Sequence, residues 1–178
     1  MENILFVRLS DENFSLNSMD EFIRHEHIAQ AWRKVGDDFV LTDTDYTLDW
    51  DLEKRRRIAK IIISGIHKDC YAYGAFANGK VVGYIFVCMR TFGSENQYID
   101  LGLFHVSEPY RRMGIGKELF RLACIEAREC GAKKLYISAN PSKDSQAAYR
   151  RMGCVHATEI NQEHVENEPA DIQMEYLL

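Results

Sequence analysis

FHVSEPYRRMGIGKELF, the stretch from Phe104 to Phe120, decides the fold of this chain. Its first residues are the end of an apolar run, and Ser107 to Pro109 interrupt that run. Gly114 and Gly116 then lead into an amphipathic segment. Glycine adopts turn dihedrals that other residues resist, and it lets a bulky group approach the backbone closely. The first N–H groups of a helix have no partner inside the helix and carry partial positive charge. The stretch therefore predicts a strand, a turn and a helix whose start binds an anion.

Basic side chains surround the same turn. Arg111, Arg112 and Lys117 would add full positive charges at its rim. A Gly-x-Gly at a helix start is by itself more often only a tight turn. The apolar strand before it and the clustered bases favour an anion cradle here.

Upstream of this turn, three runs rich in aromatic and β-branched residues predict an antiparallel meander. They span residues 70–77, 81–92 and 98–106. Asn78-Gly79, between the first two runs, is a strong hairpin signal. Gly102 lies inside the third run, and a glycine in a strand interior often marks a bulge. We therefore expect a bulge in the strand Tyr98–Val106.

Downstream, the pattern alternates between helix and strand. Residues 114–131 predict an amphipathic helix, and residues 134–139 predict a short apolar strand. Residues 145–152 predict a helix that ends at Gly153. Two closing strands are expected at Cys154 to Ile160 and at Ile172 to Leu178.

The first third of the chain is less regular. Residues 4–9 predict a strand, and Ser18 with Glu21 predicts the capped start of a short helix that runs through Phe22. Residues 24–46 fit both a helix and a hairpin that turns at residues 36–38, and we favour the hairpin. A second helix is expected from about residue 52, capped by Asp49 or Asp51 and ended by Gly65.

Composition limits the possible functions. The chain has 178 residues, of which 46% are hydrophobic, which suits a single α/β domain with a mixed sheet. A net charge of -5 argues against general nucleic-acid binding. Without a signal-peptide pattern or a long apolar run, we expect a soluble, cytoplasmic protein with no membrane contact. The five cysteines lack C-x-x-C spacing, and His25 with His27 has no further ligand nearby, so no metal site is predicted.

Two segments resemble the GNAT superfamily of acetyl-CoA-dependent N-acetyltransferases. FHVSEPYRRMGIGKELF is similar to the superfamily's strand, arm and R/Q-x-x-G-x-G/A acetyl-CoA loop. AAYRRMGC, from Ala147 to Cys154, is similar to its later A-x-x-x-Y-x-x-x-G-F segment. The resemblance covers roughly residues 71–160. It implies a mixed, mostly antiparallel central sheet flanked by helices and splayed by a bulge.

The resemblance also implies how the chain would hold acetyl-CoA, its expected co-substrate. Backbone amides of residues 113–117 would bind the pyrophosphate, and Phe104 and Val106 would pair with the pantetheine arm. Asn140 or Ser142 would take over a pantetheine contact that the family usually makes through asparagine. The full set of expected contacts is Phe104, Val106, Arg111, Arg112, Met113, Gly114, Ile115, Gly116, Lys117, Asn140 and Ser142.

Two residues are candidates for proton transfer. Tyr149 aligns with the family tyrosine near the sulfur of CoA and would protonate the leaving thiolate. The alternative interpretation is that Tyr149 is an aromatic residue that only packs in the core. Asp100 is a lone acid in an apolar run, and its spacing from Arg111 matches a strand carboxylate that some members use as base, directly or through water. By strand alternation Asp100 would share a face with Phe104, unless the bulge interrupts the count. His105 would point the other way, as a structural histidine.

The acceptor side is expected in residues 1–66, the acetyl-CoA core in residues 71–160, and a closing strand in residues 161–178. Six acids between Gly36 and Asp51, with no Lys or Arg, suggest a cationic amine acceptor. The leading hypothesis is an N-acetyltransferase in which the amine attacks acetyl-CoA directly. A homodimer is one possible assembly. The alternative is a non-catalytic acyl-CoA sensor. A dinucleotide-binding oxidoreductase fits poorly, because the glycines follow a meander and lack the G-x-G-x-x-G spacing.

Overall fold

The computed structural model describes residues 3–178 and contains one seven-stranded sheet and one separate hairpin. The sheet order is β1-β4-β5-β6-β7-β9-β8, and only β6 and β7 are parallel neighbours. The strands are β1 (Leu5–Arg8), β2 (His25–Val35), β3 (Asp38–Asp49), β4 (Cys70–Ala77), β5 (Lys80–Phe92), β6 (Tyr98–Val106), β7 (Lys134–Ala139), β8 (Val155–His156) and β9 (Ile172–Leu177). The helices are α1 (Leu52–Ile66), the 3-10 turn Glu108–Tyr110, α2 (Ile115–Glu129), α3 (Lys143–Met152) and α4 (Gln162–Asn167). The expected mixed, mostly antiparallel α/β fold is confirmed.

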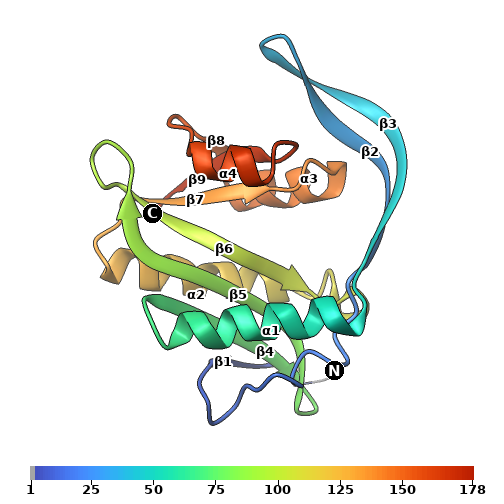
Figure 1. Cartoon of the computed structure of the whole chain (residues 1–178), viewed down its shortest axis with the longest axis vertical. Coiled ribbons are helices and arrows are strands. Elements are labelled where there is room, and N and C mark those ends of the chain that lie inside the picture. Colours follow the sequence, from blue (N-terminus) through green and yellow to red (C-terminus); the bar gives the residue numbers. More distant parts are fainter. Residues whose placement is uncertain (1–2) are drawn as a thin grey trace.

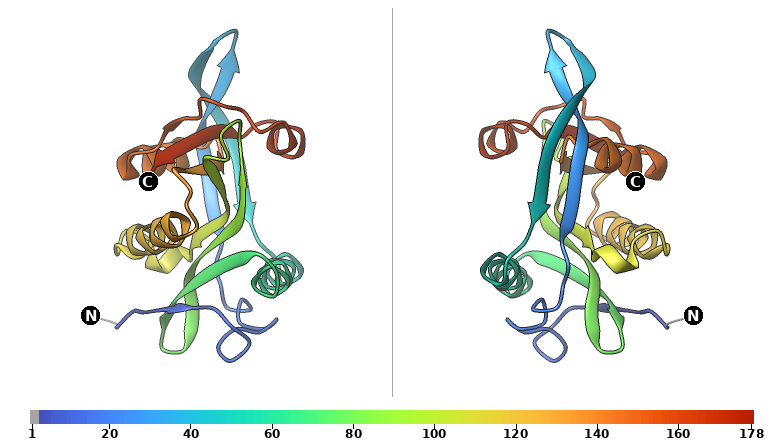
Figure 2. Two further views of the ribbon diagram at one scale, coloured as in Figure 1. Left: turned by 90° about the vertical axis from the view of Figure 1, so that its left-hand side faces the viewer. Right: turned by 90° about the vertical axis from the view of Figure 1, so that its right-hand side faces the viewer.

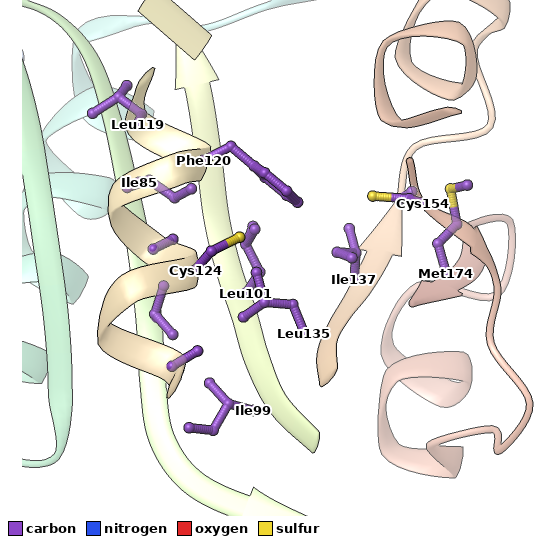
Figure 3. Close-up of a cluster of buried hydrophobic side chains, with 14 of the residues drawn as sticks. Ile85, Ile99, Leu101, Leu119, Phe120, Cys124, Leu135, Ile137, Cys154 and Met174 are labelled. Atoms are coloured by element: carbon purple, nitrogen blue, oxygen red, sulfur yellow. The ribbon is translucent and has the colours of Figure 1, made fainter. Parts of the chain in front are cut away.

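Helices cover both faces of the sheet (Figure 1), with α1 and α4 on one side and α2 and α3 on the other (Figure 2). Each face has its own apolar cluster. On the α2 side, Leu119 and Cys124 pack with Ile85 and Leu101 of the sheet (Figure 3). On the α1 side, the helix residues pack with an aromatic group around Tyr84. The sheet therefore separates two chemically distinct faces.

Gly102 forms the bulge in β6. Phe86 of β5 pairs with Leu103, whereas the next residue, Val87, pairs with Leu101, so Gly102 is left as the extra residue. One extra residue shifts the side-chain alternation by one position. The sequence-based expectation of a bulge in this strand is therefore confirmed.

The bulge changes the side to which Asp100 points. Phe104 pairs with Ile85 and packs into the cluster on the α2 side. Asp100 pairs instead with Cys88, which packs against the cluster on the α1 side. The expectation that Asp100 shares a face with Phe104 and Val106 is wrong, because simple alternation does not hold across Gly102.

The parallel strands β6 and β7 separate soon after they meet. They pair only at Tyr98–Lys134, Ile99–Leu135 and Asp100–Tyr136. Beyond these positions β7 continues to pair with β9, and β6 continues along β5. The result is the splayed sheet visible in Figure 1, with Asp100 at the point where the two strands part.

Strands β2 and β3 form a long arm that turns at Gly36, so the hairpin expected in residues 24–46 is confirmed. The arm runs past the ends of β6 and β7 near α3 (Figure 1). The Trp32 amide donates to the carbonyl of Pro141 at 2.8 Å, and Ala31 forms an isolated bridge with Ser142. These contacts attach the arm to the segment that leads into α3.

Other local expectations need correction. Residues 18–22 form turns rather than a helix, and Ser18 Oγ accepts a hydrogen bond from the Ser15 amide instead of capping a helix. The strand expected at residues 154–160 is limited to β8, because the Thr158 amide donates to the Glu175 side chain and leaves the ladder. Helix α4 then occupies part of the segment expected to hold only a closing strand.

The remaining boundaries differ from expectation by small amounts. Asp51, not Asp49, caps α1 by accepting a hydrogen bond from the Lys54 amide at 2.7 Å. Gly65 lies inside α1, which ends one residue later, and α3 begins two residues before the expected position. None of the helices in residues 3–178 is both long and apolar enough to cross a membrane.

Candidate functional site

Helix α2 begins at an open glycine turn. Gly114 is the N-cap residue and has a φ of 83°, and Arg112 also adopts a positive φ of 65°. The Glu118 amide is the first to bond within the turn, to the Gly114 carbonyl at 3.2 Å. Within residues 3–178 the amides of Ile115, Gly116 and Lys117 have no acceptor. This arrangement can bind an anion through backbone N–H groups and the positive end of the helix dipole.

Arg111 connects this turn to two strands. Its Nε donates to the Val106 carbonyl at 3.3 Å, and its guanidinium lies 3.8 Å from the Glu26 carboxylate on β2. Burial, followed by the nearby charge of Arg24, lowers the pKa of Arg111. The side chain thus fixes the end of β6 and faces the arm, whereas Arg112, Met113 and Lys117 are exposed at the turn.

Glu26 is the centre of a shielded charge cluster beside the turn. Arg24 contacts it at 2.6 Å, and the Ser142 hydroxyl donates to it at 3.4 Å. The Arg24 and Glu26 side chains are only 7% and 15% exposed, so the ion pair is largely screened from water. A pocket of about 190 Å³ adjoins the cluster between β2 and the start of α3. The arm therefore contributes charged groups to the same region as the glycine turn.

Asn140 and Ser142 shape the start of α3. Ser142 is buried and caps the helix by accepting a hydrogen bond from the Ser145 amide at 3.2 Å. Its own amide donates to Asn140 Oδ1 at 3.0 Å. Both side chains therefore use their oxygen atoms locally, and the Asn140 side-chain NH₂ group remains the donor available to a ligand.

Tyr149 projects from α3 toward β6. Its ring meets the ring of Phe104 edge-on, with centroids 6.2 Å apart. Burial, followed by the charges of Cys154 and Asp171, raises the pKa of the phenol. In residues 3–178 the Tyr149 hydroxyl has no hydrogen-bond partner, so it stays protonated and can donate.

Asp100 lies on the opposite face of the sheet, where it meets α4. Its carboxylate is 3.1 Å from Nε2 of His164, a residue that the sequence reasoning did not consider. His105 lies on the same face, is half-buried and packs edge-on against Trp50, with ring centroids 4.8 Å apart. Burial and the charges of Arg24, Arg111 and Lys54 lower the pKa of His105 to about 3. His105 is therefore a neutral, half-buried ring.

The acids of residues 37–51 do not gather into one pocket. Asp43 accepts a hydrogen bond from Gln30 at 3.0 Å, and Asp45 and Asp49 lie 3.8 and 3.4 Å from His27 and His25. Asp37 and Asp38 lie at the tip of the arm, and Asp51 caps α1. Most of these acids therefore have local partners along the arm. Within residues 3–178 no group of three or more His, Cys, Asp or Glu side chains is arranged to hold a metal ion.

The glycine turn and the splayed strands agree with a comparison between the sequence and known families. The model of the acetyltransferase (GNAT) family matches residues 32–154, well over half of the chain. The chain belongs to this family. This GNAT chain is accordingly an acyltransferase of the acetyltransferase type. None of the curated proteins matches its sequence.

Solved acetyltransferase structures share the fold. A nourseothricin acetyltransferase has a TM-score of 0.70 at 18% identity, with 98% of each chain covered. A protein named as a streptothricin acetyltransferase from Bacillus anthracis str. Ames, in complex with acetyl coenzyme A, has a TM-score of 0.70 at 16% identity, with 99% of each chain covered. An aminoglycoside 6'-N-acetyltransferase complexed with coenzyme A has a TM-score of 0.53 at 14% identity, covering 70% of this chain and 80% of that one. At these identities the likeness shows the fold.

The sequence did not point to three charged residues that lie beside the candidate site residues, namely Arg24, Glu26 and His164. Arg24 and Glu26 are two positions apart, but Glu26 is 116 positions from Ser142 and His164 is also remote from Asp100 in the sequence. The only local signals were an Arg-x-Glu pair in a strand and a histidine in a polar segment. Neither pattern is distinctive, because the contacts form only when the arm and α4 fold onto the sheet.

Proposed function

We propose that this chain transfers the acetyl group of acetyl-CoA to a primary amine of a small molecule or peptide. The observation that carries the proposal is the open turn at Gly114, whose unpaired amides lie at the end of the splayed strand β6. In this proposal the amides of residues 113–117 bind the pyrophosphate, and the exposed Arg112 and Lys117 contribute charge. The backbone of Phe104 and Val106 pairs with the pantetheine arm, and Asn140 supplies a donor.

The chemistry is direct attack of the amine on the thioester. Burial raises the pKa of all five cysteine thiols, to about 11 for Cys124 and about 12 for Cys154. Because the thiolate is the nucleophilic form, none of these cysteines is suited to a covalent acetyl-enzyme. Tyr149 would protonate the departing thiolate. Asp100 would supply the carboxylate that helps to deprotonate the acceptor, directly or through an intervening group.

The acceptor is best sought first among amine-bearing small molecules, because the full-length structural matches include nourseothricin and streptothricin acetyltransferases. Attraction of a cationic acceptor by the arm remains a prediction. Changing Asp43 and Asp45 together to Asn tests it, since a higher KM for a cationic amine with an unchanged KM for a neutral amine is expected. An equal KM for the cationic amine before and after the change would contradict the electrostatic argument.

The function itself is tested in two steps. Acetyl-CoA should raise the melting temperature of the chain in a thermal-shift assay. Addition of amines from several chemical classes, tested one class at a time, should then release free CoA thiol, measured with a thiol reagent. The absence of stabilisation by acetyl-CoA would contradict the donor assignment. Stabilisation without thiol release from any amine class would contradict the catalytic assignment and favour an acyl-CoA sensor.

A further inference from the structure

His164 and Asp100 form a paired acid and base at the point where β6 and β7 separate. His164 is on α4 and Asp100 is on β6, and their Nε2 and Oδ1 atoms are 3.1 Å apart. The two side chains are 26% and 18% exposed, so the pair is shielded but open to solvent at one side. Within residues 3–178, the one basic side chain that lies within ion-pair distance of Asp100 is that of His164. The carboxylate therefore acts on this imidazole.

The orientation of the imidazole is fixed by a second contact. The Tyr136 ring of β7 stacks on it, with centroids 5.6 Å apart and planes inclined by 25°. Tyr136 is held in turn, because its hydroxyl accepts a hydrogen bond from the Asn161 amide at 2.8 Å. Nε2 lies next to Asp100, so Nδ1 is the remaining nitrogen, and no group in residues 3–178 bonds to it. A neutral imidazole held in this way presents Nδ1 as a proton acceptor.

The pair and the proposed acid share one charged neighbour. Asp171, which precedes β9, is close enough for its charge to influence both His164 and Tyr149. Ser138 of β7 donates a hydrogen bond to Asp171 at 3.5 Å. Tyr149 is on α3 and His164 is on α4, and these two helices lie on opposite sides of the sheet (Figure 2).

We propose that His164, positioned by Asp100, is the general base that deprotonates the acceptor amine. The inference rests on the proposed function and names the intervening group between Asp100 and the amine. Nδ1 of neutral His164 takes one proton from the R–NH₃⁺ group, and the freed lone pair forms the N–C bond to the thioester carbonyl carbon. The C–S bond then breaks and its electron pair leaves on sulfur. The thiolate takes the Tyr149 proton, the second amine proton restores the phenol, and His164 returns its proton to solvent.

The pH dependence of catalysis distinguishes this arrangement from direct catalysis by Asp100. The groups that face His164 are Asp100 from β6, Tyr136 from β7, Asp171 from the segment before β9, and Glu163 from its own helix. The interaction with Asp100 is the largest influence and raises the pKa of His164. Because the neutral imidazole is the active form, kcat/KM should rise with pH through this raised pKa. Asp100→Asn removes the neighbouring charge, so the same rise should move to lower pH.

The experiment compares the wild type with His164→Gln, Asp100→Asn and a control, His67→Gln. His67 forms a comparable pair with Asp11 at 2.8 Å, at the far end of α1. Each variant is first checked for stabilisation by acetyl-CoA, which should equal that of the wild type. We then expect kcat/KM to fall about 100-fold or more in His164→Gln, with loss of the pH-dependent rise, and to be unchanged in His67→Gln.

Two results would overturn the proposal. One is a wild-type rate and pH profile in His164→Gln. The other is loss of activity in Asp100→Asn at every pH while His164→Gln stays active, which would make Asp100 itself the base. Failure of the proposed function looks different, since the wild type would then release no thiol. In that case an NMR titration still tests the pair: a His164 pKa that does not fall in Asp100→Asn would contradict the coupling.

Discussion

Replacement of Gly114 by alanine separates backbone strain from ligand binding. Gly114 has a φ of 83°, and a Cβ added there would meet no atom within 4 Å. An L-residue in this left-handed region costs about 1–2 kcal/mol, so the free energy of unfolding should fall by about that amount. For a chain of this size, each 1 kcal/mol corresponds to a fall of about 2–4 °C in melting temperature. The empty space beside Gly114 means that steric overlap adds nothing to this cost.

Gly131 is a matched control at the other end of the same helix. It has a φ of 80°, and an added Cβ would likewise meet no atom within 4 Å. Gly131→Ala should therefore cost about the same stability as Gly114→Ala. Only Gly114 lies at the proposed phosphate site. A methyl group there would hold the phosphates away from the amides and remove at least one charge-assisted hydrogen bond, worth about 1.5–3 kcal/mol.

The expected outcome is a loss of affinity in one variant only. The binding energy at stake predicts about a 10- to 150-fold higher Kd for acetyl-CoA in Gly114→Ala and an unchanged Kd in Gly131→Ala. Isothermal titration calorimetry gives the Kd values, and urea denaturation gives the stabilities. Equal weakening in both variants would show that strain, not contact, controls binding. Wild-type affinity in Gly114→Ala would remove this turn from the phosphate site.

Three further outcomes follow from single contacts. Tyr149→Phe keeps the ring packing on Phe104 but removes the proton donor, so kcat should fall about 100-fold with little change in the KM for acetyl-CoA; steady-state kinetics that show a change only in KM would argue against the acid role. Burial alone would raise the pKa of Glu175, but its hydrogen bonds from Lys134, Tyr98 and Thr158 outweigh burial and lower it to about 2. The ionised Glu175 therefore stabilises the folded state fully above the ordinary pKa of a glutamate, and this stabilisation is lost as the pH falls through about 2. In urea denaturation, Glu175→Gln should lower the free energy of unfolding by about 3 kcal/mol at pH 7 and by little near pH 2. Asp51→Ala removes the α1 cap and should cost about 1 kcal/mol, whereas Asp49→Ala, at an exposed position on the arm, should cost much less in the same assay.

The parts of the fold that the sequence predicted well depend on local chemistry. The turn at Asn78-Gly79 needs two residues with positive φ, and these residues have φ values of 49° and 77°. Helix α2 and strand β7 have long, regular apolar patterns, and their observed bounds lie close to the expected ones. Such signals are visible in a single sequence because each residue pattern is stabilised mainly by its own neighbours.

The errors occurred where distant residues decide the structure. Ser18 with Glu21 has a helix-capping pattern, yet Met19 and Phe22 are buried in turns against the α1 side of the sheet. Strand β8 is short because the Glu175 side chain takes the Thr158 amide. Neither competing contact can be read from the nearby sequence. The pairing of His164 with Asp100 was not predicted for the same reason, because the two residues are distant in the sequence.

The candidate site depends most on one unpaired residue in β6. Because Gly102 is extra, Asp100 faces α4, whereas Phe104 faces α2 and the ring of Tyr149. Without the bulge, both proton-transfer groups would lie on the face where the donor is proposed to bind, and that face would have no separate place for the acceptor. In the proposed mechanism the bulge therefore places the two substrates on opposite faces of the gap between β6 and β7. Motifs around Gly114 could identify the proposed donor side because it is built from adjacent residues, but the proposed acceptor side combines β6 and α4, and only the folded chain brings these together.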